Sequence, residues 1–367
     1  MEKSFVIIRP LEADMLPNPR LEAVLPRACT VAASVVLTTA GELNEWYRQG
    51  SAPGAHLLWV IDLGRDGINL EYTRMLRLLR SGLLLDGTMG AMIIDAQTEL
   101  YTKSTAEELA LALNHCGCAL VGRSLVEGTA SLENFRIAAR NLGTDNLLEA
   151  YCNSAAQLVK NLLHFTFPLS VRPQVTMLHA SNPKRSNTLA LAMAVEKRLA
   201  GVMDFRVIGL RNGTLYDCSG CPYEVCLHFG EKNSCVYGGI MVKDVYPSIL
   251  ESEAILMVCP NYNDALTANI TGCINRLTAL YRKRAFYDKA MFAIVVSGYS
   301  GSDNLTMQLI AALNMNKSFY LPPHFAMMET AFAPGSAMAL KDIGKRLDDF
   351  ADNMYYSLTG KKLPAQN

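Results

Sequence analysis

Four cysteines stand close together in the second half of the chain, in a pattern typical of metal or redox chemistry. They occur as Cys218-x-x-Cys221, followed by Cys226 and Cys235, all within 18 residues. Thiolates this close in sequence can share one metal centre. The spacing therefore predicts a metal site formed by Cys218, Cys221, Cys226 and Cys235.

The residues alone leave the chemistry of this group open. An iron–sulfur cluster, a zinc ion and cysteines without metal all fit four thiols, and Cys218 with Cys221 could instead form a redox disulfide. The other cysteines lie in or beside apolar segments, where we expect buried and unreactive thiols. They are Cys29, Cys116, Cys118, Cys152, Cys259 and Cys273.

A polar turn in the second half has the composition of a phosphate-binding loop. It follows the strand-like run Val175–His179 and leads into a helix rich in Ala and Leu. A helix N-terminus offers unpaired backbone N–H groups and a positive dipole end, to which hydroxyls and cations would add. We expect phosphate contacts from Ser181, Lys184, Arg185, Ser186, Asn187 and Thr188. The alternative is an ordinary N-capped helix, because Ser, Asn and Thr favour caps.

Two further loops follow strand-like runs in the same half. One is aromatic and polar, and the other is rich in glycine. The carboxyl ends of parallel strands meet at one edge of a sheet, so these loops and the phosphate loop suit a flat phosphorylated ring such as FMN. The residues expected to border it are Pro260, Asn261, Tyr262, Asn263, Asp264, Ser297, Gly298, Tyr299 and Gly301. For the tyrosines, ordinary surface turns are the alternative.

The elements that would position these loops alternate between strands and helices. In the first half we expect strands at Phe5–Arg9, Ser34–Thr39, Leu57–Leu63 and Met89–Asp95, with a fifth at Ala119–Val121. Helical stretches lie at Glu42–Arg48, Leu70–Ser81, Thr105–His115, Leu132–Asn141 and Asn146–His164. This alternation implies a parallel sheet with helices on both sides.

The second half repeats the alternation after a proline-containing linker at Phe165–Gln174. Its strands are expected at Val175–His179, Phe205–Leu210, Ala254–Cys259, Ala290–Ser297 and Phe319–Leu321. Its helices are expected at Asn187–Leu199, Val245–Ser252, Asn269–Tyr281, Asn304–Asn314 and Ala337–Leu358. The sequence thus predicts two tandem flavodoxin-like α/β/α domains with parallel sheets: a degenerate one at 1–164 and an FMN-binding one at 175–367, with a cysteine-rich insert at about 211–243.

Short segments recur between the halves and suggest a duplication. The matching pairs are Ala32–Ala40 with Met203–Leu210, Met89–Asp95 with Met291–Ser297, and Leu111–Asn114 with Ala311–Asn314. The offset grows from about 170 to about 200 positions where the four cysteines sit. A duplication would build one fold twice, with the insert in the second copy only.

The first copy lacks the residues that would hold a flavin. Its counterpart of the phosphate loop contains Glu12 and Asp14 and offers no hydroxyl or glycine, and its counterpart of Pro260–Asp264 has no tyrosine. We therefore expect no flavin in this half.

The totals exclude several classes of protein. Lys+Arg and Asp+Glu are balanced at 34 each, which argues against a nucleic-acid partner or an acidic membrane surface. No apolar run reaches the roughly 20 residues that span a bilayer, and the N-terminus does not read as a signal peptide. Ten cysteines without export indicate a reducing compartment, so we expect a cytoplasmic protein.

The second half resembles the NADPH-dependent FMN reductase family over about Val175–Met328. The family's first loop ends in Gly-Asn-Thr, where this chain has Ser186-Asn187-Thr188, and its Pro-x-Tyr loop matches Pro260-Asn261-Tyr262. The resemblance implies that Ser181, Asn187 and Thr188 hold the FMN phosphate and that Pro260–Asp264 border the isoalloxazine. The family's usual arginine falls at Pro183, so Lys184 or Arg185 would have to supply that charge.

Some relatives, the iron–sulfur flavoproteins, carry a compact cysteine motif at this point and bind a [4Fe-4S] cluster beside FMN. Their motif usually has two residues between the second and third cysteines, where this chain has four. The resemblance therefore implies a cluster through a partly matching motif.

The function implied is that of an FMN-dependent NAD(P)H oxidoreductase or electron-transfer flavoprotein. A nicotinamide donor would pass hydride to the flavin, and an unidentified acceptor would take the electrons. We assign no catalytic acid or base, and expect structural roles for His179 and His228. The expected partners are small molecules and a second copy in a homodimer. The alternatives are an electron carrier that does not use NAD(P)H and a scaffold without flavin.

Overall fold

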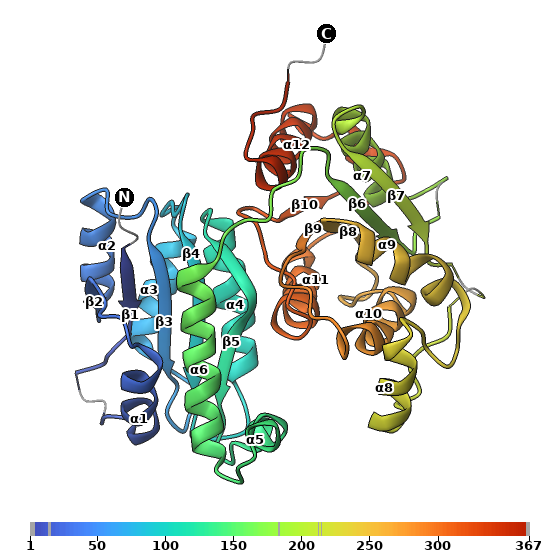
Figure 1. Cartoon of the computed structure of the whole chain (residues 1–367). Coiled ribbons are helices and arrows are strands. Elements are labelled where there is room, and N and C mark those ends of the chain that lie inside the picture. The colour runs from blue at the N-terminus through green and yellow to red at the C-terminus, as the bar shows by residue number, and fades with distance from the viewer. Residues whose placement is uncertain (1–3, 14–15, 183, 212, 214, 365–367) are drawn as a thin grey trace. The chain divides into compact units, whose positions relative to one another are not determined.

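The computed structural model describes residues 4–13, 16–182, 184–211, 213 and 215–364, and Figure 1 traces the chain. The chain divides into two compact units, Met1–Thr166 and Phe167–Asn367. Each unit contains one sheet of five strands, and the strand pairs within each sheet are parallel.

The sheet of the first unit has the strand order β2-β1-β3-β4-β5. Its strands are β1 (Phe5–Ile8), β2 (Val35–Leu37), β3 (His56–Asp62), β4 (Met89–Asp95) and β5 (Ala119–Gly128). Every residue of β3 and β4 is buried, because helices cover both faces of the sheet. The helices are α1 (Pro19–Ala28), α2 (Ala40–Arg48), α3 (Leu70–Arg80), α4 (Thr102–His115), α5 (Arg136–Leu142) and α6 (Leu147–His164), with a 3-10 turn η1 (Glu133–Phe135) before α5.

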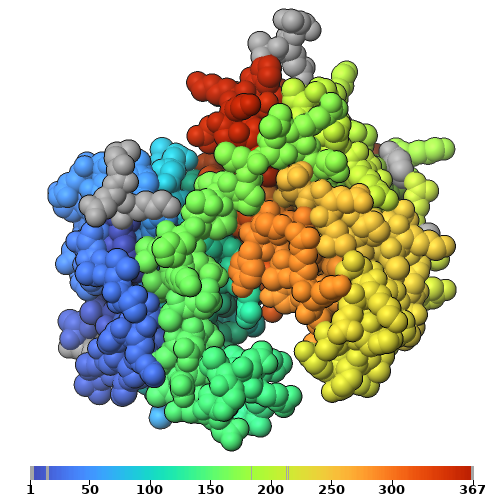
Figure 2. Space-filling view, in the orientation of Figure 1, coloured from blue at the N-terminus to red at the C-terminus, as the bar shows by residue number. Residues whose placement is uncertain are grey.

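Helices α1 and α6 pack together on one face of this sheet, while α2, α3 and α4 lie on the other (Figure 1). The apolar side of α6 faces a core built from α1 and the central strands, and includes Leu158, Val159 and Leu162. Its outer side forms part of the surface of the first unit, shown in green in Figure 2.

The sheet of the second unit has the order β10-β9-β8-β6-β7. Its strands are β6 (Gln174–His179), β7 (Asp204–Gly209), β8 (Ala254–Pro260), β9 (Ala290–Ser297) and β10 (Ala326–Thr330). Its helices are α7 (Asn187–Leu199), α8 (Tyr223–Glu231), α9 (Tyr246–Glu251), α10 (Ala268–Tyr281), α11 (Ser302–Leu309) and α12 (Ile343–Thr359). Short π-helical segments η2 (Met241–Val245) and η3 (Ile310–Met315) and a 3-10 turn η4 (Ser336–Ala339) complete the unit.

The two units share one topology, which confirms the predicted tandem flavodoxin-like fold. In each, the first strand pairs with the second and the third, and the fourth and fifth strands extend the sheet. The matching segments ending in Asn114 and Asn314 also have matching roles. Both side chains are buried, and each amide donates to a carbonyl just beyond its helix, on Cys118 and on Phe319 respectively.

Several predicted elements were wrong in position. Phe319–Leu321 is not the fifth strand, because Tyr320 makes only an isolated bridge to Ala290 and two prolines follow. The strand is β10, further along the chain. The first unit's fifth strand is longer than Ala119–Val121, and the C-terminal helix begins at Ile343 instead of Ala337.

Two helices were not predicted. Helix α1 contains Pro19 at its first turn and Pro26 in its interior, which hid its helical period. Helix α8 lies within the cysteine-rich insert and is seen in yellow at the surface of the second unit in Figure 2. No helix in the described part of the chain combines the length and apolarity needed to cross a membrane.

Candidate functional site

The predicted phosphate loop lies between β6 and α7, at the carboxyl edge of the second sheet. Ser186 is the N-cap of α7, and its hydroxyl accepts from the Leu189 N–H at 3.1 Å. Ser181 is 3% exposed, and its hydroxyl oxygen is buried without a hydrogen-bond partner. A buried hydroxyl without a partner costs free energy, so this atom is suited to a bound acceptor. Lys184 and Arg185 are both exposed on the loop, while Pro183 lies outside the described residues.

His179 supports this loop from the end of β6. The ring is buried, and its Nδ1 accepts from the Ser181 N–H at 3.3 Å. Burial lowers the pKa of His179, and the neighbouring Arg211 guanidinium lowers it further, although the bond from Ser181 opposes them. The imidazole is therefore neutral at pH 7, in keeping with the structural role expected for it.

The side chain of Asn187 bonds the protein's own backbone. Its side-chain amide donates to the carbonyls of Ala331 at 3.1 Å and Ala333 at 2.8 Å, and its Oδ1 accepts from the Ala337 N–H at 3.4 Å. The side chain thus ties the phosphate helix to the loop after β10. A contact between Asn187 and a phosphate would have to come from its backbone N–H. Thr188 is buried beside it.

The loops after β8 and β9 are held together by side chains predicted to border the ring. The Asn261 amide donates to Asp264 Oδ1 at 3.0 Å and to Ser297 Oγ at 3.1 Å. Ser297 is fully buried and also accepts from the Ser302 hydroxyl at 2.8 Å. At Gly301 the φ angle is 93°, and a Cβ there would lie 2.4 Å from Asp264 Oδ1, so only glycine fits. These polar side chains shape the loops from within.

Three large aromatic side chains remain exposed on consecutive loops of this edge. Tyr262 is 61% exposed and Tyr299 is 74% exposed. Asn263 and Asp264, with φ angles of 58° and 55°, form the left-handed turn that follows Tyr262. The third aromatic residue, Phe332, is 72% exposed, and its ring lies 5.2 Å from that of Tyr299.

Phe332 was missed by sequence reasoning. It follows β10, and because the fifth strand was predicted earlier in the chain, the loop after it was not identified. Its ring also lies against Gly298, where an added Cβ would come within 3.2 Å of it. The aromatic surface of this edge is therefore wider than predicted and includes the fifth strand's loop.

Residues 173–333 match the family model of NADPH-dependent FMN reductase. The match spans the phosphate loop, both predicted ring loops and Phe332, and the family is one of oxidoreductases. We call residues 173–333 the matched segment. A search among curated proteins found no match.

Solved structures of oxidoreductases are similar to about half of the chain. An NAD(P)H:quinone oxidoreductase from Methanothermobacter marburgensis shares 14% identity over 50% of this chain and 96% of its own, with a TM-score of 0.38. An FMN-dependent NADH-azoreductase from Bacillus anthracis str. Ames Ancestor, in complex with FMN, shares 9% identity over 50% of this chain and 99% of its own, with a TM-score of 0.34.

The matched segment also contains the four cysteines, which line one cavity of about 190 Å³. Its walls come from the insert and from α10. The residues that line the cavity include Cys218, Cys221, Cys226, Cys235, Arg276 and Arg282. All four cysteines are free thiols, so the structure holds no Cys218–Cys221 disulfide. The four cysteines grouped by their spacing in sequence thus line the same cavity.

No three metal-binding side chains among the described residues are arranged to hold a single metal ion. A tetrahedral zinc site is thus not formed by Cys218, Cys221, Cys226 and Cys235, and the predicted metal site has no support from a preformed geometry. Of the other cysteines, five are buried as expected and Cys29 is half-buried. Burial raises the pKa of Cys118, Cys259 and Cys273 to about 12, which makes them poor nucleophiles.

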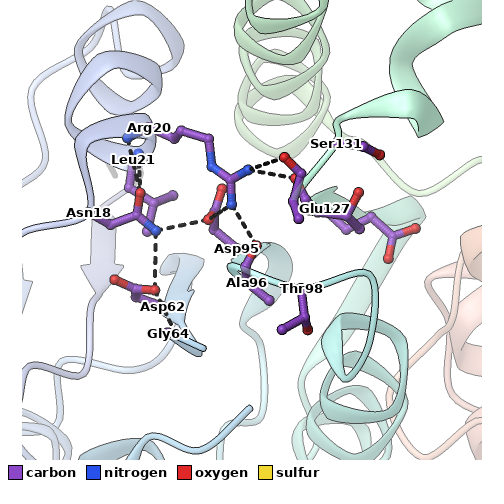
Figure 3. A network of polar contacts seen from close by, with 12 residues as sticks. Asn18, Arg20, Leu21, Asp62, Gly64, Asp95, Ala96, Thr98, Glu127 and Ser131 are labelled. Carbon is purple, nitrogen blue, oxygen red and sulfur yellow. Dashed lines mark hydrogen bonds and ion pairs between the residues drawn. The ribbon is translucent and has the colours of Figure 1, made fainter. Parts of the chain in front are cut away.

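The carboxyl edge of the first unit is filled by its own side chains (Figure 3). The Arg20 guanidinium bonds Asp95 at 2.6 Å and also donates to the carbonyls of Ala96 and Thr129. The Asn18 amide donates to Asp62 at 3.1 Å and to Asp95 at 2.8 Å. This network occupies the edge where the second unit has its candidate site.

Asp95 is fully buried, and burial raises its pKa, although Asn18 and Arg20 stabilise the charged form. Only glycine fits at position 128, because a Cβ added to Gly128 would lie 2.1 Å from Asp95 Oδ2. Of the acids expected to repel a phosphate here, the Glu12 carboxylate accepts from the Leu70 N–H at 2.7 Å, and Asp14 lies outside the described residues.

Proposed function

We propose that the second unit binds FMN and acts as an NAD(P)H-dependent oxidoreductase. The observation that carries the proposal is the partnerless buried hydroxyl of Ser181, in the loop between β6 and the phosphate-type helix α7. It lies on the same sheet edge as three exposed aromatic side chains, inside the segment that matches the FMN reductase family model.

The residues present fit the two ends of FMN. Ser181 Oγ and the first backbone N–H groups of α7 would hold the phosphate, with positive charge from Lys184 and Arg185. Tyr262 and Tyr299 would border the ring from the loops after β8 and β9. Bound FMN would accept hydride from the nicotinamide and release electrons singly or in pairs.

The protein's own part is to position these groups. Asn187 fixes the phosphate helix against the loop that carries Phe332, and Asn261 locks the two ring loops to each other. The exposed aromatic rings would cover bound FMN and a stacked nicotinamide and keep water from them. We assign no proton transfer to a side chain, in keeping with chemistry that the cofactor supplies.

We further propose that the cysteine cavity holds a [4Fe-4S] cluster, which would make the protein an electron-transfer flavoprotein. The cavity brings four thiols together, and a cubane cluster separates its cysteine ligands more widely than a single tetrahedral ion does. Two arginine Nε atoms at this cavity, on Arg276 and Arg282, are buried without partners. The cluster would supply one-electron transfer.

The proposed partners are a nicotinamide donor, a small-molecule electron acceptor and a second copy of the chain. Ten free cysteines would be kept reduced in the cytoplasm, where we place the protein. Light scattering of the purified protein tests the homodimer, and a monomeric mass would contradict it.

The proposed activity is tested on protein purified without oxygen. We expect a visible flavin spectrum, FMN released on denaturation, and bleaching of the flavin band within seconds of adding NADPH or NADH. Flavin that is bleached by dithionite but not by either nicotinamide would identify an electron carrier instead. If the protein stays colourless after incubation with FMN, the second unit does not bind flavin and the protein is a scaffold without flavin.

A further inference from the structure

An exposed apolar patch lies at the carboxyl edge of the first unit. Five large side chains on the segments that follow β1, β3 and β4 are between 41% and 62% exposed. We call them the edge patch, and they are Leu11, Ile68, Leu70, Leu100 and Tyr101. Half of the surface of five such side chains is about 400 Å² of apolar area, which is in the range of functional patches on monomeric proteins.

Contacts between the three segments make the edge patch continuous. The segment after β1 reaches the start of α3, because the Glu12 carboxylate accepts from the Leu70 N–H at 2.7 Å. The segment after β4 reaches the loop after β3, because the Tyr101 ring lies against Gly67. A Cβ added to Gly67 would come within 2.2 Å of that ring. The five side chains therefore lie on one surface.

Tyr101 is held in a backbone conformation that its side chain disfavours. Its φ angle is 77°, in the left-handed region that is uncommon for residues other than glycine. It is also the N-cap of α4 and makes no side-chain capping bond there, whereas serine or asparagine is preferred at such a position. A tyrosine here lowers local stability, and backbone strain of this kind clusters at functional sites.

At the same edge, the protein's own polar network fills the place of a small ligand (Figure 3). The Asp95 carboxylate bonds Arg20 at 2.6 Å and Asn18 at 2.8 Å. A phosphate or a flat ring would have to displace these bonds. The edge patch is therefore better suited to another protein surface than to a small molecule.

The charges around the edge patch are of both signs, which suits a second copy of the chain. Arg65 and Asp66 are exposed neighbours beside Ile68, and neither forms an ion pair within the part of the chain that the structure describes. Glu99 is exposed beside Leu100. A nucleic acid or an acidic membrane would need a basic rim. In a two-fold dimer the same surface meets itself in reverse order, so a cation of one copy can lie opposite an anion of the other.

We propose that the edge patch is the surface on which a second copy of the chain docks with two-fold symmetry. This inference rests on the homodimer of the proposed function and says which surface forms it. The matched segment includes no part of the edge patch. The five apolar side chains would form the centre of the interface and the charged residues its rim. With a rim of similar area, each copy would bury about 800 Å², the usual size of a specific interface.

The test compares Leu100→Asp with Leu84→Asp in the full chain. Leu100 follows β4 and is 61% exposed, while the control Leu84 precedes β4, at the opposite edge of the sheet, and is 54% exposed. Sedimentation velocity over a range of protein concentrations gives the dissociation constant of the dimer. We expect Leu100→Asp to raise this constant at least about tenfold, because each copy would bury a carboxylate against apolar surface. Leu84→Asp should match wild type.

A charge exchange tests whether the occupant is a second copy. Arg65→Glu makes the rim acidic on both copies, so like charges meet and the dimer should weaken. The double variant Arg65→Glu/Asp66→Lys restores both signs on both copies and should recover most of the affinity. A double variant that stays as weak as Arg65→Glu would overturn self-association through this surface.

FMN binding separates this inference from the proposed activity. Leu100→Asp should bind FMN as tightly as wild type, because every residue proposed for FMN lies in the second unit. A wild-type dimer that Leu100→Asp leaves intact would overturn the inference while the homodimer stands. A wild-type protein that stays monomeric at every concentration would overturn the homodimer as well. Wild-type protein that dimerises through this surface but takes up no FMN would refute the proposed activity alone.

Discussion

At the residue scale, the candidate site depends on atoms that lack partners within the folded chain. Ser181 is the clearest case, since its hydroxyl is buried and unpartnered while its backbone N–H is held by His179. A group of this kind lowers the stability of the ligand-free protein and strengthens binding of an acceptor, so one substitution should have opposite effects on the two quantities.

We expect Ser181→Ala to weaken FMN binding about tenfold, the loss of one hydrogen bond to a charged group. The same change should stabilise the flavin-free protein by about 1 kcal/mol, because the unsatisfied hydroxyl is removed. Fluorescence titration with FMN measures the affinity, and urea unfolding measures the stability.

The control is Ser154→Ala, which lies in the other unit and should leave FMN binding unchanged. A Ser181→Ala variant with wild-type FMN affinity would exclude the phosphate contact.

His179 predicts how stability depends on pH. Its pKa is lowered below the ordinary 6.5 in the folded protein, so the unfolded chain takes up a proton more readily. Stability is therefore unaffected by this group above about pH 6.5 and falls as the pH drops below it. In the His179→Gln variant, the urea unfolding midpoint measured at mildly acidic pH should move closer to the midpoint measured at neutral pH. If the variant loses as much stability in acid as the wild type, other groups cause the acid sensitivity.

The sequence identified the loops of the site better than it identified the role of each side chain. Ser181, Tyr262 and Tyr299 lie at the predicted edge, because loop positions follow from the order of strands and helices. The inward bonds of Asn187, Asn261 and Ser297 depend on contacts with distant segments, and no local pattern encodes them.

At the element scale, the two units use the same edge of the same fold in different ways. In the second unit, the loop before α7 contains the buried, unpartnered hydroxyl of Ser181. In the first unit, α1 begins at Asn18, whose side chain caps the helix and also bonds the carboxylates of Asp62 and Asp95. Arg20 then joins α1 to the ends of β4 and β5.

We expect Arg20→Met to destabilise the first unit by about 3 kcal/mol, because it leaves the buried Asp95 without its cationic partner. The double variant Arg20→Met/Asp95→Asn should recover much of this loss, since the buried charge is removed as well. Urea unfolding of wild type, of the single variants Arg20→Met and Asp95→Asn, and of the double variant gives the coupling free energy between the two side chains. Additive losses would mean that the ion pair does not stabilise the edge.

Element types were predicted more reliably than element ends. The central strands β3, β4, β8 and β9 are buried on both faces and read as continuous apolar runs. The edge strand β10 alternates between buried and half-exposed positions. The sequence Ala326–Thr330 therefore indicated a strand less strongly than the apolar run at Phe319–Leu321. That run packs in the core but does not pair with a neighbouring strand along its length.

At the scale of the whole molecule, every residue proposed for FMN and the cluster lies in the second unit. Binding should therefore stabilise that unit alone, by about 2.7 kcal/mol at a ligand concentration of 100 times Kd. Hydrogen exchange with and without FMN tests this. We expect slower exchange in β6, β8 and β9 and unchanged exchange in β3 and β4, whereas protection of β3 and β4 would bring the first unit into the binding reaction.

The Arg20–Asp95 pair has a consequence for protein engineering. A designer who wished to open the first unit's edge to an external ligand would find that Arg20 cannot be replaced alone without a loss of stability, because the fully buried Asp95 would lose its cationic partner. The neighbouring Gly128 leaves no room to fill the gap with a larger side chain. Conversion of this edge into a receptor would thus need a coordinated, multi-site change, and stepwise selection for binding would meet a barrier at its first step.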